Sequence, residues 1–272
     1  MRHCVALLLS GGTGKRLGAE IPKQYIRTGG RMMITRSLHA LFLCPEIEAV
    51  QIVADAAWRS LIEEDWKASV SVTRGTEWIR GFSGPGDTRQ LSILNGLEDI
   101  SAQYGEDTVV LIHDAARPFV SAEMLQNCIT ACEEHDGAMP VLPMKDTVYY
   151  SDNGSTVTQL LERECIFAGQ APEAFVLGKY LAANRALLPE RILMIKGSTE
   201  PAVMAGMDIA MITGEEGNFK VTTRGDLERY EEIIKRQAGG GKDTSSALRA
   251  PSPQGEGKEM STLGKGNGDK HI

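Results

Sequence analysis

Short apolar runs alternate along the chain with longer stretches in which apolar residues recur at helical spacing. The compact apolar runs predict buried strands at residues 5–9 (VALLL), 49–54, 70–73, 108–113 (TVVLIH) and 137–141. Helical spacing predicts amphipathic helices at 35–43, 60–66, 89–104, 122–134 and 226–236. This order predicts an α/β fold, with a Rossmann-like, mostly parallel sheet and helices on both faces.

Residues 145–163 (KDTVYYSDNGSTVTQLLER) break this rhythm. Two β-rich runs flank Asn153-Gly154, and Asn-Gly is the strongest short signal for a β-hairpin. We therefore expect a hairpin arm that projects from the core. Such an arm could be a dimer contact or a simple surface flap.

Composition changes sharply near the end of the chain. From residue 238 the sequence is rich in Gly, Ser, Lys and Pro, which predicts a folded domain at 1–237 and a disordered tail at 238–272. No apolar stretch approaches the ~20 residues that a membrane span needs, and no signal-peptide pattern is present, so we expect a cytoplasmic protein. The net charge of −7 argues against a general nucleic-acid binder. The five scattered cysteines form no CxxC pair and indicate reduced thiols.

The first candidate site is a glycine-rich loop after the first strand, within LLLSGGTGKRLGAEIPKQY at 7–25. It is not a Walker A loop, because Arg16 stands where Ser or Thr would follow Gly14-Lys15. It is not the Rossmann GxGxxG either, because Leu17 replaces the third glycine. Glycines still let backbone N–H groups approach phosphate, and basic residues supply charge. The candidates are Ser10, Gly11, Gly12, Gly14, Lys15, Arg16 and Lys23. The alternative is an ordinary turn with solvated lysines.

The second candidate site, GDTRQLS at 86–92, opens a predicted helix. A helix N-terminus with Ser92 and the backbone around Gly86 suits a base or phosphate contact. The alternative is that Asp87 only caps the helix and that Arg89 is solvated.

Two more candidate sites contain charged residues. HDAARPF at 113–119 follows a buried strand, where Asp114 could bind a metal ion or a substrate hydroxyl and Arg117 a phosphate. The alternative is a capping and turn device. Lys220 lies in GNFKVTT, a predicted short strand, and would need a buried anion partner unless it is an edge-strand lysine with its head in solvent. Cations, a glycine loop and no evident nucleophile together indicate phosphoryl or nucleotidyl transfer.

Six segments in order, spanning about residues 3–236, resemble the cytidylyltransferases that couple CTP to a small polyol phosphate. They are LSGGTGKRLGAEIPKQY, GDTRQLSILNGL, VLIHDAARPFV, PVLPMKDTV, GQAPEAF and GNFKVTTRGDL. This family includes enzymes that act on 2-C-methyl-D-erythritol 4-phosphate, an isoprenoid precursor, and on D-ribitol 5-phosphate. The resemblance implies that the glycine loop and Lys23 hold the CTP triphosphate with Mg²⁺.

The resemblance also implies a role for each matching position. Arg16, Lys23 and Lys220 would stabilise the phosphate under attack. The segment with Gly86, Asp87, Arg89 and Ser92 would bind the nucleotide. Asp114, Arg117 and Thr147 would bind the acceptor, and Asp114 is also the possible metal ligand. Arg163, on the arm, would bind the acceptor phosphate, in the partner subunit's site of a homodimer.

Some positions depart from the family pattern. The family often has QTPQ where this chain has Gln170-Ala171-Pro172-Glu173, so one threonine hydroxyl is lost. The preceding FAGQ is closer to the ribitol type, whereas HDAARP is closer to the erythritol type. The acceptor therefore stays open at this point. Two other hypotheses also remain, an inactive nucleotide-binding or scaffold protein and a nucleotidyltransferase with a different base preference.

Overall fold

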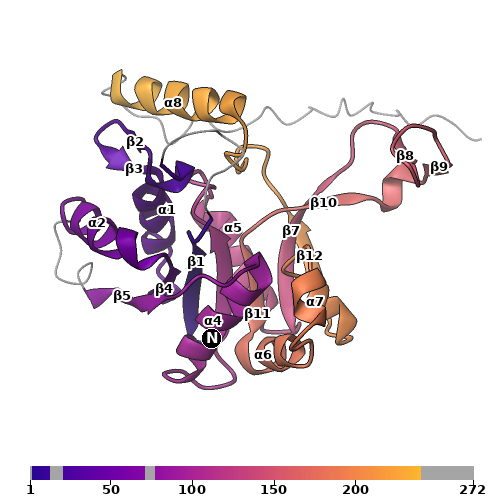
Figure 1. The fold of residues 1–272 in the computed structure, drawn as a ribbon, viewed down its shortest axis with the longest axis horizontal. Coiled ribbons are helices and arrows are strands. Elements are labelled where there is room, and N and C mark those ends of the chain that lie inside the picture. Colours follow the sequence, from indigo (N-terminus) through magenta and orange to yellow (C-terminus); the bar gives the residue numbers. More distant parts are fainter. Residues whose placement is uncertain (1, 13–20, 71–76, 240–272) are drawn as a thin grey trace, which may run out of the picture.

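The computed structural model describes residues 2–12, 21–70 and 77–239. Its centre is an eight-stranded sheet in the order β10-β7-β11-β6-β1-β4-β5, with β12 paired to β7 (Figure 1). The strands are β1 (Cys4–Leu9), β4 (Ile47–Val53), β5 (Ile79–Ser83), β6 (Val109–Asp114), β7 (Gly137–Pro143), β10 (Phe167–Gly169), β11 (Glu173–Val176) and β12 (Ile209–Thr213).

The strands are parallel in the half of the sheet from which the glycine-rich loop emerges. β1 lies between β4 and β6 and is parallel to both, and β5 is parallel to β4. β12 is parallel to β7, whereas β10 and β11 run antiparallel to their neighbours. The predicted mostly parallel α/β fold is therefore confirmed. The loops that follow β1, β4, β5 and β6 all emerge at one edge of the sheet.

Helices cover both faces of this sheet. They are α1 (Met33–Phe42), α2 (Ala56–Lys67), α4 (Arg89–Ser101), α5 (Ala122–Ala131), α6 (Leu177–Arg185) and α7 (Glu200–Met204). The last helix, α8 (Arg224–Gly239), instead packs in a separate cluster with Met33, Ala116 and Val221. One core joins the sheet to α1, α2 and α5, and a second core joins its other face to α4, α6 and α7. Along β1, Cys4, Ala6 and Leu8 enter the first core while Val5 and Leu7 enter the second, as the two-residue period of a strand requires. Because both faces of the sheet are covered, the sequence of β1 is a continuous apolar run.

A glycine lets one helix approach the sheet closely. A Cβ at Gly96 of α4 would lie 2.3 Å from Cδ1 of Leu7 in β1. The close approach brings the N-terminal end of α4, which carries Arg89, to the edge of the sheet where β1 ends.

A hairpin arm extends away from this body, as Figure 1 shows. It consists of β8 (Val148–Tyr150) and β9 (Gln159–Leu161), paired antiparallel, and the chain returns through a 3-10 helix, η3 (Arg163–Cys165). Gly154 at the tip has a φ of +72°, which fits the predicted Asn-Gly turn, although residues 151–158 separate the strands. The hairpin prediction is confirmed, and a second, smaller hairpin joins β2 (Arg27–Thr28) to β3 (Arg31–Met32).

Several sequence predictions need correction or completion. Lys220 does not lie in a strand: the segment around it is held by single contacts, such as Val221 N–H to the Ala116 carbonyl at 2.9 Å, rather than by a ladder. β5 and the elements from β10 to β12 were not predicted. The strand expected at 70–73 falls mainly outside the described residues.

The described cysteines are all free thiols, four of them buried. Among the helices of the described chain, none has the length and apolar character to cross a bilayer.

Candidate active site

The glycine loop follows β1 at the edge where the parallel strands end. The Ser10 hydroxyl is buried and donates to the Val53 carbonyl at 3.0 Å, which ties the loop to the end of β4. A Cβ on Gly11 would lie 2.7 Å from Cβ of Pro85, so only glycine allows this loop to touch the loop after β5. Gly14, Lys15 and Arg16, predicted to act here, lie outside the described residues.

The loop after β5 leads into α4. Thr88, not Asp87, caps the helix, because its side chain accepts a hydrogen bond from Leu91 N–H at 3.2 Å. Ser92 accepts from Gly86 N–H at 3.0 Å and donates to the Thr88 carbonyl at 2.9 Å. The Ser92 hydroxyl therefore shapes the loop. Asp87 is exposed and is available for another contact.

These two loops enclose a cavity of about 440 Å³ at the carboxyl ends of the strands. Its lining brings together most of the residues that the sequence assigned to the nucleotide. They include Ser10, Gly11, Gly12, Lys23, Gly86, Asp87, Arg89 and Ser92. Asp114 and Lys220 complete one wall. Lys23 comes from a short 3-10 helix, η2 (Lys23–Tyr25), that begins after Pro22.

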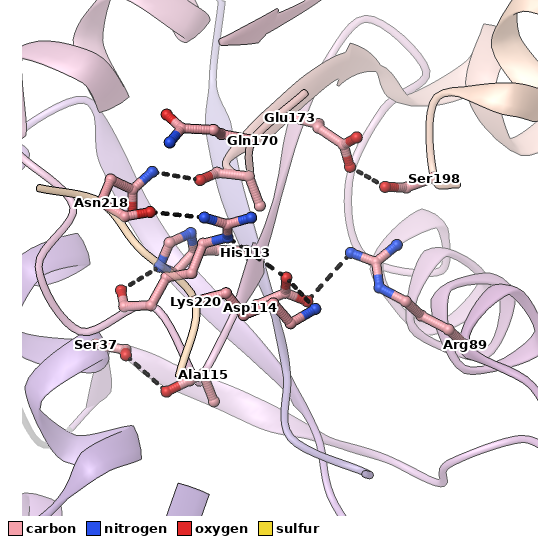
Figure 2. A network of polar contacts seen from close by, with 12 residues as sticks. Ser37, Arg89, His113, Asp114, Ala115, Gln170, Glu173, Ser198, Asn218 and Lys220 are labelled. Carbon is pink, nitrogen blue, oxygen red and sulfur yellow. Dashed lines mark hydrogen bonds and ion pairs between the residues drawn. The ribbon is translucent and has the colours of Figure 1, made fainter. Parts of the chain in front are cut away.

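Asp114, the last residue of β6, lies against three cationic side chains, and Figure 2 shows two of them, Arg89 and Lys220. Its carboxylate lies 2.8 Å from Lys220 Nζ, 3.2 Å from Arg89 Nη2 and 3.7 Å from Arg117 Nε. Burial raises the pKa of Asp114, but the charges of Arg89 and Lys220 outweigh burial and hold it well below its ordinary value. The carboxylate is therefore ionised, and it fixes the two cations on the cavity wall. Asp114 is therefore the buried anion partner that the sequence requires for Lys220.

A second cavity, of about 200 Å³, lies on the other side of this cluster. It shares Arg89, Asp114 and Lys220 with the first cavity and adds Arg117, Glu173 and Lys196. Glu173 accepts hydrogen bonds from the hydroxyls of Ser198 and Thr199, the latter at 2.9 Å. Burial raises the pKa of Glu173, although Arg89 and these hydroxyls oppose the shift. The two cavities thus meet at one charged wall.

Sequence reasoning missed Glu173 and Lys196 as cavity residues. For Glu173 the sequence did contain a signal, the departure from QTPQ at 170–173, which placed an unexpected carboxyl group in a family segment.

A buried polar framework that includes His113 and Asn218, both labelled in Figure 2, holds Arg117 in place. His113 Nε2 donates to the Arg117 carbonyl at 3.0 Å, and Arg117 Nη1 donates to the Asn218 carbonyl at 2.6 Å. The Asn218 side chain in turn donates to the Ala171 carbonyl at 2.7 Å. Burial lowers the pKa of His113 to about 4, so the imidazole is neutral at pH 7 and donates from Nε2.

Two predicted residues lie away from these cavities within the described chain. Arg163 is half-exposed in η3 on the arm side, where it donates to the Lys145 carbonyl at 3.2 Å and pairs with Glu164. Thr147 is exposed at the base of the arm. Neither lines either cavity. Their roles in acceptor binding stay predictions.

A metal site on Asp114 does not fit the observed geometry. Both carboxylate oxygens already face cations, which would repel Mg²⁺. In the described part of the chain, no group of three His, Cys, Asp or Glu side chains is placed to hold a metal ion. We therefore derive no catalytic step through a protein-bound metal.

Known proteins of one family match most of the chain. The family model of 2-C-methyl-D-erythritol 4-phosphate cytidylyltransferase (IspD) matches residues 4–236. The protein of that name from Geobacter metallireducens is 33% identical over 235 residues, which are 85% of this chain and 97% of that protein. A bifunctional enzyme IspD/IspF from Paramagnetospirillum magneticum is 33% identical over 229 residues, 84% of this chain but only 56% of the relative.

Solved structures agree on the fold. 4-Diphosphocytidyl-2C-methyl-D-erythritol synthase from Anaerococcus prevotii superposes with a TM-score of 0.72 at 24% identity, covering 86% of this chain and 97% of that chain. The 2-C-methyl-D-erythritol 4-phosphate cytidylyltransferase of Francisella tularensis gives 0.68 at 22% identity, with 85% and 99% covered. From the family model and the sequence identity to its members, the chain belongs to the 2-C-methyl-D-erythritol 4-phosphate cytidylyltransferase family.

Proposed function

We propose that this protein transfers the cytidylyl group of CTP to 2-C-methyl-D-erythritol 4-phosphate and releases pyrophosphate, a step of isoprenoid precursor synthesis. The observation that carries the proposal is the pair of cavities with one shared wall of Arg89, Asp114 and Lys220. The larger cavity, with the glycine loop and Lys23, suits the nucleotide. The smaller one, with Arg117 and Lys196, suits an anionic acceptor.

The chemistry follows from this placement. A phosphate oxygen of the acceptor attacks the α-phosphorus of CTP, a new P–O bond forms, and the bond to the bridging oxygen of the departing pyrophosphate breaks. The attacking oxygen already carries negative charge, so the site needs no general base. The barrier instead comes from bringing two anions together and from charge on the transferring phosphate. Lys23 and Lys220, which line the nucleotide cavity, offset that charge.

Magnesium belongs to this proposal through the substrate. Mg²⁺ is commonly held by substrate phosphates together with few protein ligands. We expect the triphosphate oxygens of CTP to carry the ion, with Asp114 left to its cations.

An inactive scaffold on this fold is disfavoured because the cationic wall is intact. Lys23, Arg89 and Lys220 all line the nucleotide cavity, and Asp114 holds two of them at fixed positions. A protein that only binds nucleotide would not need this wall between two cavities.

A pyrophosphate-release assay tests the function. CTP, UTP and ATP would each be combined with 2-C-methyl-D-erythritol 4-phosphate, D-ribitol 5-phosphate and a few sugar phosphates. We expect release with CTP and the methylerythritol substrate. Release only with ribitol phosphate would move the enzyme to the other branch of the cytidylyltransferases, and no release with any pair would overturn the proposal.

Lys23→Ala provides the residue-level test. We expect kcat to fall by about 10²–10³, as when one group that stabilises transition-state charge is removed. Lys67→Ala is the matched control, because Lys67 is exposed on α2 and pairs only with Glu63 among the described contacts. Near-normal turnover of a folded Lys23→Ala protein would remove Lys23 from the mechanism.

A further inference from the structure

Two residues that have no role so far follow Lys23 directly. Gln24 and Tyr25 complete the 3-10 helix η2, and both are almost completely buried, at 4% and 3% exposed. A glutamine buried beside a cavity needs partners for its polar side chain. Those partners lie in the glycine loop.

Gln24 joins two carbonyl groups of that loop. Its Nε2 donates to the Ser10 carbonyl and to the Gly12 carbonyl, each at 2.6 Å. A side-chain amide has two N–H donors, so both are used on one short stretch of backbone. Tyr25 adds a third bond, from its hydroxyl to the Ser10 carbonyl at 2.8 Å.

The direction of these bonds matters for an anionic ligand. In a trans peptide the C=O and the following N–H point to opposite sides. With the Ser10 carbonyl held by Gln24 and Tyr25, the Gly11 N–H faces away from that pair. Carbonyl oxygens would repel a triphosphate, whereas N–H groups attract it. Glycines have few backbone barriers, so side chains outside the loop must select this orientation.

Tyr25 is itself held in place. Its ring stacks on Trp58 with centroids 4.2 Å apart and planes 16° apart. Trp58 belongs to the first turn of α2, whose cap, Asp55, accepts from Ala57 N–H at 2.9 Å directly after β4. The hydrogen bonds to the glycine loop therefore start from buried side chains that are packed against the first turn of α2.

The same turn carries Lys23 to the cavity. Since Lys23 and Gln24 are consecutive in η2, the bonds of Gln24 link the position of the lysine to that of Ser10 and Gly12. They also join the two described segments on either side of residues 13–20. We infer that Gln24 is a positioning residue for the nucleotide, with Tyr25 as its support, and that it sets CTP affinity without touching the acceptor. This inference rests on the proposed use of the larger cavity for CTP.

Gln24→Met tests this role because it keeps the side-chain length and removes both donors. We expect the Kd for CTP, measured by calorimetry without acceptor, and the KM for CTP to rise by about tenfold or more. The KM for the acceptor should stay within about twofold, since its cavity is untouched. A purely structural role would instead lower the melting temperature and leave the Kd of the folded fraction unchanged. Gln103→Met, at an exposed glutamine bonded to the Asp99 carbonyl, is the matched control.

Tyr25→Phe keeps the stack on Trp58 and removes only the hydroxyl, so it carries the test if Gln24→Met does not fold. We expect it to weaken CTP binding in the same direction, by a smaller factor. The inference would be overturned by a CTP Kd within twofold of the wild type in folded Gln24→Met. If Gln24→Met does not fold, the same result in folded Tyr25→Phe would overturn it. If the wild type binds CTP but releases no pyrophosphate, the proposed function fails while the Kd comparison still decides on Gln24. If the wild type binds no CTP, both fail.

Discussion

His113 is a fully buried imidazole that supports the arginine of the acceptor cavity. Burial lowers its pKa to about 4, against an ordinary value of 6.5. Between these values the unfolded chain binds a proton that the folded protein does not, so acidification weakens folding. The free energy of unfolding should fall by about 1.4 kcal/mol per pH unit from pH 6.5 to 4, or about 3 kcal/mol in total, from this residue.

His113→Gln checks this, because glutamine keeps an N–H donor but does not titrate. Urea unfolding at several pH values between 7.5 and 4.5 should show a shallower loss of stability in the variant, although the variant is less stable at pH 7.5. Asp114 does not interfere, since its lowered pKa confines its own loss of stability to pH values below its ordinary 3.8. Parallel stability curves for both proteins would contradict the assignment of a neutral buried His113.

At the scale of elements, the site depends on how two loops touch. Gly11→Ala should destabilise the ligand-free protein by about 1–3 kcal/mol, because its Cβ would overlap Pro85 in the loop after β5. Gly12→Ala is the matched control, since a Cβ there has no neighbour within 4 Å among the described residues. Chemical unfolding of the two variants without nucleotide measures the difference. Equal stability would mean that the loops do not pack as described.

The start of α4 offers a second test of local structure. Thr88→Ala should lower the free energy of unfolding by about 1 kcal/mol through loss of the N-cap. Asp87→Ala, at the neighbouring exposed carboxylate, should leave stability nearly unchanged. A larger loss of stability in Asp87→Ala than in Thr88→Ala would instead make Asp87 the cap, which was the alternative hypothesis from the sequence.

Elements with strong periodicity could be predicted from the sequence, and weakly patterned ones could not. β1 and residues 109–112 of β6 are continuous apolar runs because both faces of the sheet are covered. β5 (IRGFS) buries only Ser83 fully and has no alternation to detect. The segment around Lys220 has strand-forming residues, but its few tertiary contacts hold it as an irregular extension, so propensity alone gave the wrong element.

The candidate site likewise contains residues that the sequence could place and residues that it could not. Asp114 and the glycine loop could be placed together because parallel strands end at one edge. Glu173 reaches that edge by another route. It is the first residue of β11, which runs antiparallel to β6 and therefore starts where β6 ends. A sequence that does not reveal β11 gives no reason to place Glu173 beside Arg89.

At the scale of the whole molecule, the arm places Arg163, a predicted site residue, outside both cavities of its own chain. Arg163 has its described contacts with Lys145 and Glu164, outside both cavities. The arm also exposes apolar side chains, including Tyr149, Tyr150 and Leu160. Both features fit the predicted homodimer in which each arm reaches the other subunit. The dimer stays a prediction, and it determines which subunit Arg163 serves.

Mixed dimers decide between the two arrangements. Arg163→Ala and Lys23→Ala proteins should each be nearly inactive alone. If Arg163 serves the partner's site, a mixed dimer regains one complete site, because the subunit with intact Lys23 receives Arg163 from its neighbour. After dissociation and random reassociation of equal amounts, activity should recover to about a quarter of the wild type, since half of the dimers are mixed and each has one working site. Two preparations of the same variant, treated alike, control for the procedure. A mixture as inactive as its components would place the complete site within a single chain and leave the arm to contact alone.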